Sequence, residues 1–168
     1  AFEAIYAQLE GLTLSYFEWG TLAALWLFKQ QACQVQVLEV GLGGRLDAVT
    51  VIDADAALIT PIDLDHQAWL CNDRASIAKE KAGVIKKGVP VVTVPQDPAA
   101  LRVIKKQAAA LKAPLTVTGR DVDFSCRFES SREHGPHTLI CLTTPTSKFE
   151  HLRVPLPGEH QAVNCGLA

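Results

Sequence analysis

The stretch QVQVLEVGLGGRLDA, residues 34–48, decides the fold class. Residues 34–40 form a short run rich in β-branched side chains, and the glycines that follow end it. A short apolar run bounded by glycine is typical of a buried strand. A second run of this kind, residues 56–62, is followed by acidic residues. Together the two runs predict buried, neighbouring strands of a parallel sheet.

Helical and strand patterns alternate through the first 119 residues. Helices are predicted at residues 2–9, 16–31, 75–85 and 98–111, and further strands at 89–94 and 115–118. The helix at 98–111 has a clear start, because Asp97 is a good N-cap residue and Pro98 suits the first helical position. The helix at 16–31 is apolar on nearly every side, which predicts that it lies inside a core. The alternation predicts an α/β fold with a mostly parallel, doubly wound sheet.

The pattern changes after Gly119, where apolar and polar residues begin to alternate. This alternation predicts an antiparallel β meander over residues 120–157. Residues 158–168 read as the start of a helix. The predicted organisation is one incomplete domain, with an α/β core at 1–119, a meander at 120–157 and a helix start at 158–168.

The composition excludes several classes of protein. The 168 residues fit one domain, and 16 Lys and Arg against 18 Asp and Glu give a net charge of -2. There is no basic block that would neutralise a nucleic-acid backbone. The most apolar stretch, residues 21–28, is far shorter than the roughly 20 residues that cross a membrane. Five scattered cysteines without a C-x-x-C pair predict reduced thiols in the cytoplasm, with no disulfide framework or zinc site.

Glu39 is the first candidate functional residue. It alternates with Val35 and Val37 on one face of a strand predicted to be buried, where an unpaired carboxylate is costly. One interpretation is a strand-end glutamate that reaches solvent or pairs with Arg45. The other is a metal ligand at the carboxyl end of a parallel strand, where open α/β sheets bind their ligands.

Asp63, Asp65 and His66 follow the second predicted strand. The carboxyl ends of neighbouring parallel strands share one sheet edge, so these residues are expected to lie near Glu39. Carboxylate oxygens with one imidazole suit a Mg²⁺ ion that binds nucleotide phosphate, whereas a cage of His and Cys would suit zinc. The alternative is that the acidic residues cap a helix and the histidine is only hydrogen-bonded.

Lys81 is the most informative single position. On a helical wheel it lies between Ile77 and Ile85, while the neighbouring lysines point away, so its ammonium group is predicted to face the core. Burial lowers the pKa of a lysine, and a neutral amine can react with CO₂ to give a carbamate that replaces a carboxylate. The alternative is a buried stem whose charge pairs with Glu39 or Asp65.

The glycine-rich segment at 41–47 does not match the common nucleotide-binding patterns. The dinucleotide fingerprint G-x-G-x-x-G requires a glycine where this chain has Leu46, which disfavours a nicotinamide oxidoreductase. A Gly-Lys dipeptide is also absent from the sequence, so the chain carries no G-x-x-x-x-G-K-[ST] phosphate loop.

Three segments together resemble the folylpolyglutamate synthase and dihydrofolate synthase family of the Mur ligase superfamily. They are LEVGLGGRLDA at 38–48, DH at 65–66 and AKEKAG at 78–83, in the order and spacing of the family. In addition, SYFE at 15–18 resembles the family's T-x-F-E segment, and GEHQAVN at 158–164 resembles its adenine-side motif. The resemblance covers nearly the whole chain and implies a Mur-ligase-like central ATP-binding domain.

The resemblance implies an ATP-dependent ligase that adds L-glutamate to dihydropteroate or tetrahydrofolate through an acyl phosphate. Glu39 and His66 would bind Mg²⁺, and Lys81, carbamylated, would act with His66 in catalysis. Asn164 and Gln161 would contact the adenine of ATP. The pteroate side of the cleft would be lined by Ser15, Tyr16, Phe17, Glu18, Leu46, Asp47 and Ala48. The implied partners are small molecules only (folate or dihydropteroate, L-glutamate and ATP), and the parent enzyme would be a cytoplasmic monomer.

The chain departs from the family at Thr50, Cys71 and Cys165, where Asn, Gly and Ala are usual. These changes concern loop geometry and leave the implied metal ligands intact. The family's phosphate loop would precede Ala1 and its glutamate-binding domain would follow Ala168, so the chain is expected to be a fragment without activity of its own. The alternatives are a non-catalytic nucleotide- or pterin-binding remnant and another Mur-type amino-acid ligase.

Overall fold

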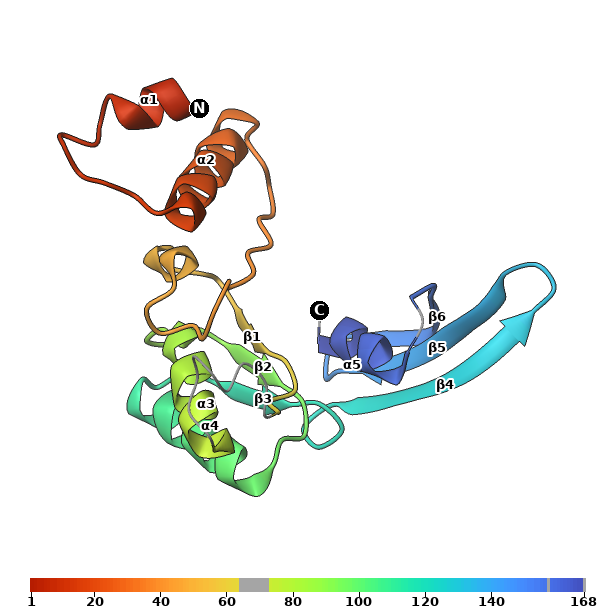
Figure 1. Cartoon of the computed structure of the whole chain (residues 1–168). Helices are drawn as coiled ribbons and strands as arrows, with labels where there is room; N and C mark the ends of the chain where they lie inside the picture. The colour runs from red at the N-terminus through yellow and green to blue at the C-terminus, as the bar shows by residue number, and fades with distance from the viewer. Residues whose placement is uncertain (64–72, 157, 168) are drawn as a thin grey trace. The chain divides into compact units, whose positions relative to one another are not determined.

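The computed structural model describes residues 1–63, 73–156 and 158–167. The chain forms two compact units, Ala1–Asp53 and Ala54–Ala168, and the elements of each are labelled in Figure 1. Among the residues described, no helix combines the length and the apolar character needed to cross a membrane.

The first unit contains two α-helices and one 3₁₀ helix. They are α1 at Phe2–Tyr6, α2 at Tyr16–Gln30 and η1 at Ala48–Val51. The helix predicted at 16–31 is confirmed, and the one predicted at 2–9 is shorter than expected.

The prediction that α2 lies inside a core is wrong for this structure. Ala23 is its one buried residue, and Tyr16 at its start is 96% exposed. The physical reason is the small size of the unit: within residues 1–53, α2 has the short helix α1 and the single turn of η1 to pack against. Two such short elements cannot cover a helix that is apolar on all sides.

The strand predicted at 34–40 is also wrong. These residues have no strand structure, and Val35 and Val37 are 79% and 88% exposed. A strand needs neighbours for its backbone N–H and C=O groups, and residues 1–53, all of which the structure describes, contain no other strand to supply them. The sequence run has the composition of a strand, but this unit has no sheet for it to join.

The second unit begins with a parallel α/β arrangement, as predicted. Its elements are β1 at Ala57–Ile59, α3 at Arg74–Lys81, η2 at Ala82–Val84, β2 at Val91–Thr93, α4 at Pro98–Ala110 and β3 at Leu115–Val117. The strands pair in sequence order, β1-β2-β3, and both pairs are parallel. Right-handed crossovers between strands in this order put both helices on one face, and Figure 1 shows α3 and α4 together beside the sheet.

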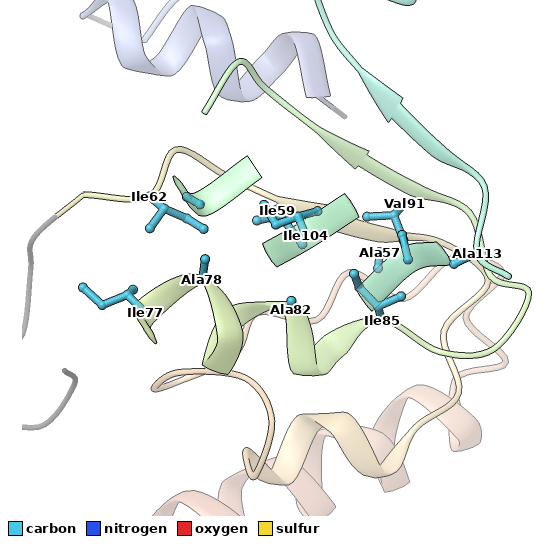
Figure 2. Packing of buried hydrophobic residues seen from close by; sticks show 12 residues of the cluster. Ala57, Ile59, Ile62, Ile77, Ala78, Ala82, Ile85, Val91, Ile104 and Ala113 are labelled. Atoms are coloured by element: carbon cyan, nitrogen blue, oxygen red, sulfur yellow. The ribbon is translucent and has the colours of Figure 1, made fainter. Parts of the chain in front are cut away.

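Small and branched side chains fill the space between this sheet and its helices. Helix α4 buries residues four apart, which places them on one face: Ala100, Ile104 and Ala108. Figure 2 shows Ala78 and Ala82, from α3 and η2, pointing toward Ile59 and Ile104. The opposite face of the sheet is less covered, since Leu58 of β1 is 46% exposed. The burial predicted for this strand is therefore found on one face only.

The predicted antiparallel meander is confirmed. Its strands are β4 at Asp123–Ser131, β5 at Gly135–Thr143 and β6 at Lys148–Val154, in the order β4-β5-β6. Helix α5, Glu159–Leu167, confirms the predicted helix start and packs on this sheet. The contact is a small apolar cluster of Ile140, Val154 and Ala162.

Gly166 has a steric reason to be glycine, because a Cβ atom there would lie 2.2 Å from Cε2 of Phe124. We expect Gly166→Ala to destabilise the second unit by about 1–3 kcal/mol, since the ring must move. The matched control is Gly20→Ala in α2, where nothing lies within 4 Å of the added Cβ. There the gain in helix propensity should stabilise by up to about 1 kcal/mol. Urea unfolding of the unit that carries each change measures both; equal shifts in the same direction would contradict the packing.

Candidate active site

An aromatic cleft of about 870 Å³ lies within the first unit. It is formed by α1, one side of α2 from Tyr16 to Phe28, residues 37–39 and Val49. Its aromatic lining consists of Phe2, Tyr6, Tyr16, Phe17, Trp19 and Phe28. The cleft also contains two carboxylates, Glu3 and Glu39. An apolar pocket of this size with few polar groups is the usual form of a small-molecule site.

A capping box fixes the start of α2, the helix that carries four of these six aromatic residues. The backbone N–H of Ser15 donates to Glu18 Oε2 at 2.7 Å, and the N–H of Glu18 donates to Ser15 Oγ at 3.3 Å. Hydrogen bonds from Ser15 hold the pKa of Glu18 below its ordinary value. The backbone N–H groups of Ser15 and Glu18 are therefore both hydrogen-bonded within the chain. This fixes the first turn of α2, from which Tyr16 and Phe17 line the cleft.

Asp47 closes the glycine-rich loop. Its Oδ2 accepts from the N–H groups of Gly41 and Leu42 at 2.9 and 3.1 Å. Its Oδ1 accepts from the N–H of Val49 at 2.9 Å and caps η1. Both carboxylate oxygens are thus committed to the loop backbone. Of the neighbours predicted to line the substrate side, Leu46 is 81% exposed, and neither it nor Ala48 lines the cleft.

The glycines of this loop have conformational and steric roles. Gly43 and Gly44 are buried and have φ angles of 72° and 146°, which residues with a side chain rarely adopt. At Gly41 an added Cβ would lie 2.8 Å from Cε2 and Cζ of Phe17. The aromatic ring that lines the cleft therefore rests on the loop at its first glycine.

The second unit carries the residues predicted to contact adenine. Gln161 and Asn164 both lie on α5, and both are half-buried. Asn164 Oδ1 is buried and has no hydrogen-bond partner within the described part of the chain. A buried amide oxygen without a partner costs free energy, which is recovered when a ligand supplies a donor.

Lys81 ends α3 and is half-buried, beside the fully buried Ala78 and Ala82, whereas Lys79 is exposed. The predicted apolar face of this helix is confirmed, since Ile77 and Ala78 are at most 1% exposed. The side chain of Lys81 makes no ion pair or hydrogen bond in the ranges 1–63, 73–156 and 158–167.

The predicted metal set is not assembled among the described residues. No group of three His, Cys, Asp or Glu side chains in that part of the chain is arranged to hold a metal ion. Glu39 is exposed and lines the aromatic cleft of the first unit. Asp65 and His66 lie outside the described residues, so the expectation that they meet Glu39 at one sheet edge stays a prediction.

Comparison with known proteins identifies the family. Residues 13–168 match the Mur ligase middle domain. This chain belongs to that family. The matched residues include both sheets of the second unit. The predicted resemblance to folylpolyglutamate and dihydrofolate synthases is confirmed by the relatives.

This chain is 47% identical over 116 residues to an Escherichia coli dihydrofolate synthase/folylpolyglutamate synthase. The match covers 66% of this chain and 28% of the relative. The apo form of L. casei FPGS superposes with a TM-score of 0.85 at 30% identity, over 98% of this chain and 39% of that one. E. coli FolC in complex with DHPP and ADP has a TM-score of 0.80 at 37% identity, over 96% and 36%. The chain thus spans less than half the length of these relatives.

The sequence did not predict several residues that line the aromatic cleft of the first unit. Phe2, Tyr6 and Trp19 were assigned to helices without a site role, and Phe28 was assigned to a buried core. The signal that could have identified them is the density of aromatic residues on two short helices, which exceeds what so small a unit can bury.

Proposed function

We propose that this chain is part of an ATP-dependent ligase that joins L-glutamate to a folate or to dihydropteroate. In the proposed reaction, a substrate carboxylate attacks the γ-phosphorus of ATP, which gives an acyl phosphate and ADP. The amine of glutamate then attacks the acyl carbon, phosphate leaves, and an amide forms. The protein contributes positioning and charge neutralisation.

The observation that carries this proposal is the aromatic cleft of the first unit. A pteridine ring is flat and carries hydrogen-bonding edges, so it suits a pocket walled by aromatic faces with a few carboxylates. Tyr16, Phe17 and Glu39 line that cleft. The other residues predicted to line the pteroate side are not among those that line this cleft: Ser15, Glu18, Leu46, Asp47 and Ala48. We propose that they face the substrate beside it, where the hydrogen bonds of Ser15, Glu18 and Asp47 hold α2 and the glycine-rich loop in place.

For the nucleotide, we propose that Asn164 and Gln161 contact the adenine ring of ATP. The unpaired Oδ1 of Asn164 is an acceptor suited to the exocyclic amino group of adenine. The relative from E. coli was solved with ADP, which supports a nucleotide as ligand of this fold.

We propose Mg²⁺ as the metal, with Glu39 and His66 as ligands, because a carboxylate and an imidazole with open positions suit this ion. Lys81 is proposed to be carbamylated: its neutral amine attacks the carbon of CO₂, an N–C bond forms, and a proton leaves to solvent. Lys81 is half-buried at the end of α3, beside the fully buried Ala78 and Ala82, which supports a specific role for its amine. His66 is proposed to assist Lys81 in catalysis.

We infer a cytoplasmic, monomeric parent enzyme that acts on small molecules. The described cysteines, Cys33, Cys126, Cys141 and Cys165, are all free thiols, which suits a reducing compartment. A non-catalytic remnant that binds nucleotide or pterin is the second candidate, and binding of ATP or folate without dependence on a metal ion would support it.

The cleft assignment is tested with Phe17→Ala in the full-length protein. Loss of the ring should raise the KM for the pteridine substrate roughly tenfold, which corresponds to about 1.4 kcal/mol of lost contact, and leave the KM for ATP unchanged. Steady-state ADP release at varied substrate measures both constants.

The matched control is Leu27→Ala, which removes an exposed apolar side chain of the same helix outside the cleft. It should leave both constants unchanged. An increase in the KM for ATP alone in Phe17→Ala, or equal effects of the two substitutions, would overturn the assignment of the cleft to the pteridine.

A further inference from the structure

One side chain, Gln96, ties together the carboxyl ends of two parallel strands. Its Nε2 donates to the carbonyl oxygen of Thr60 at 2.9 Å and to Thr93 Oγ1 at 3.0 Å. Its Oε1 accepts from the N–H of Ile62 at 2.9 Å. The hydroxyl of Thr93, a fully buried residue, in turn donates to the carbonyl oxygen of Ile59 at 2.8 Å. Three of these hydrogen bonds connect β2 and its following loop to the end of β1, and the fourth joins Gln96 to Thr93.

These side-chain hydrogen bonds begin where the backbone pairing of β1 with β2 ends. The register of β1 with β2 ends at Ile59 and Thr93, so the backbone groups of residues 60–62 have no strand partner there. Ile62 is nonetheless 5% exposed and belongs to the core of this unit. An unpaired backbone group in such a position would be costly. The Gln96 amide pairs with two of these groups, the C=O of Thr60 and the N–H of Ile62, and so fixes the course of the chain as it leaves β1.

The segment held by Gln96 leads directly to Asp63, at the sheet edge where the carboxyl ends of the parallel strands lie. Asp63 follows Ile62, and Asp63 Oδ1 accepts from an Nη atom of Arg74 at 2.7 Å. Arg74 is the first residue of α3, the helix that ends at Lys81. Open α/β sheets bind their ligands at this edge, outside the carboxyl ends of the strands. The position of residues 60–63 is thus set by a side chain 34 residues away.

We propose that Gln96 is a positioning residue for the nucleotide side of the site, acting with Thr93 through the backbone of residues 60–63. This role rests on the proposed ligase function. It requires no contact between Gln96 and substrate, because the side chain uses its acceptor and both donors within the protein.

The test compares Gln96→Ala with Gln107→Ala in the full-length protein. Gln107 lies on α4, is also half-buried, and makes no side-chain hydrogen bond among the described residues. Gln96→Ala should speed hydrogen exchange at the N–H of Ile62. It should also lower kcat/KM for ATP roughly 10- to 100-fold and leave the KM for the pteridine unchanged. Gln107→Ala should change neither exchange nor kinetics.

Two substitutions at Thr93 separate a positioning role from lost stability. Thr93→Ser keeps the hydroxyl, so its hydrogen exchange at Ile62 and its kinetics should equal those of the unchanged protein. Thr93→Val keeps the shape and should behave like Gln96→Ala. Faster exchange at Ile62 without any change in kcat/KM for ATP would overturn the proposal, and so would normal exchange with impaired kinetics.

Calorimetry with ADP keeps this test separate from the ligase function. If the full-length protein has no ligase activity, the proposed function fails, but the affinity for ADP can still be compared among the same variants. Weaker binding of ADP in Gln96→Ala and Thr93→Val, with normal binding in Thr93→Ser, supports the positioning role. Equal affinity in all variants overturns it.

Discussion

Lys81→Ala in the full-length protein should lose glutamate ligation by roughly 10²- to 10³-fold, the range seen when a preorganised charge-stabilising group is removed from an active site. Lys81 is half-buried at the end of α3, where Ala78 and Ala82 beside it are fully buried. If the amine carries a carbamate, short carboxylic acids should restore part of the lost rate in Lys81→Ala. The measurement is ADP release with and without added acid.

The control is Lys79→Ala, which removes an exposed lysine from the same helix. It should keep normal activity, and acid should not change it. Native mass spectrometry of the intact, unchanged protein should also find the added mass of one CO₂, which Lys81→Ala should lack. Equal activity of Lys81→Ala and the unchanged protein would rule out the proposed role.

Asp47→Ala is expected to lower kcat/KM for the pteridine substrate by about 10²-fold, because loss of a loop anchor misplaces the groups that depend on it. Three backbone N–H groups, those of Gly41, Leu42 and Val49, donate to this carboxylate. The loop also supports the ring of Phe17 at Gly41. Hydrogen exchange at Leu42 and Val49 should accelerate together with the kinetic loss.

Asp47→Asn sharpens this test, since it keeps one acceptor oxygen and replaces the other by an N–H₂ group that cannot accept. It should behave nearly like Asp47→Ala. Asp55→Ala, which removes an exposed carboxylate, serves as the control and should change neither exchange nor kinetics. A variant at Asp47 with slow loop exchange and a raised KM would mean that the carboxylate contacts the substrate directly and does not act through the loop.

The elements that could be predicted from the sequence are those whose signals are local. Asp97 and Pro98 mark the start of α4, and the structure has the N–H of Ala99 donating to Asp97 Oδ1 at 2.8 Å. The alternation after residue 119 likewise predicts the meander, because each strand there pairs with its neighbour in sequence. Local patterns suffice where the partners are also local.

Partnership over long sequence distances could not be predicted in this way. The run at 34–40 has the composition of a strand, but composition does not say whether a neighbouring strand is available. Gln96 reads as an ordinary polar loop residue, yet its partners are 34 and 36 residues away. The cleft was missed for a related reason: aromatic residues on α2 predict burial, and only the size of the unit reveals that they line a cavity instead.

We propose above that this Mur ligase middle domain is part of a folate ligase. The most direct measurement is the mass of the product formed when the full-length protein is given ATP, L-glutamate and dihydropteroate. We expect a pteridine heavier by one glutamate residue, with one ADP released for each amide formed. Without dihydropteroate no ADP should form, and without glutamate no more than one ADP per protein, from a single acyl phosphate. Continued ADP release over many turnovers without glutamate, or a pteridine of unchanged mass, would refute the proposed reaction.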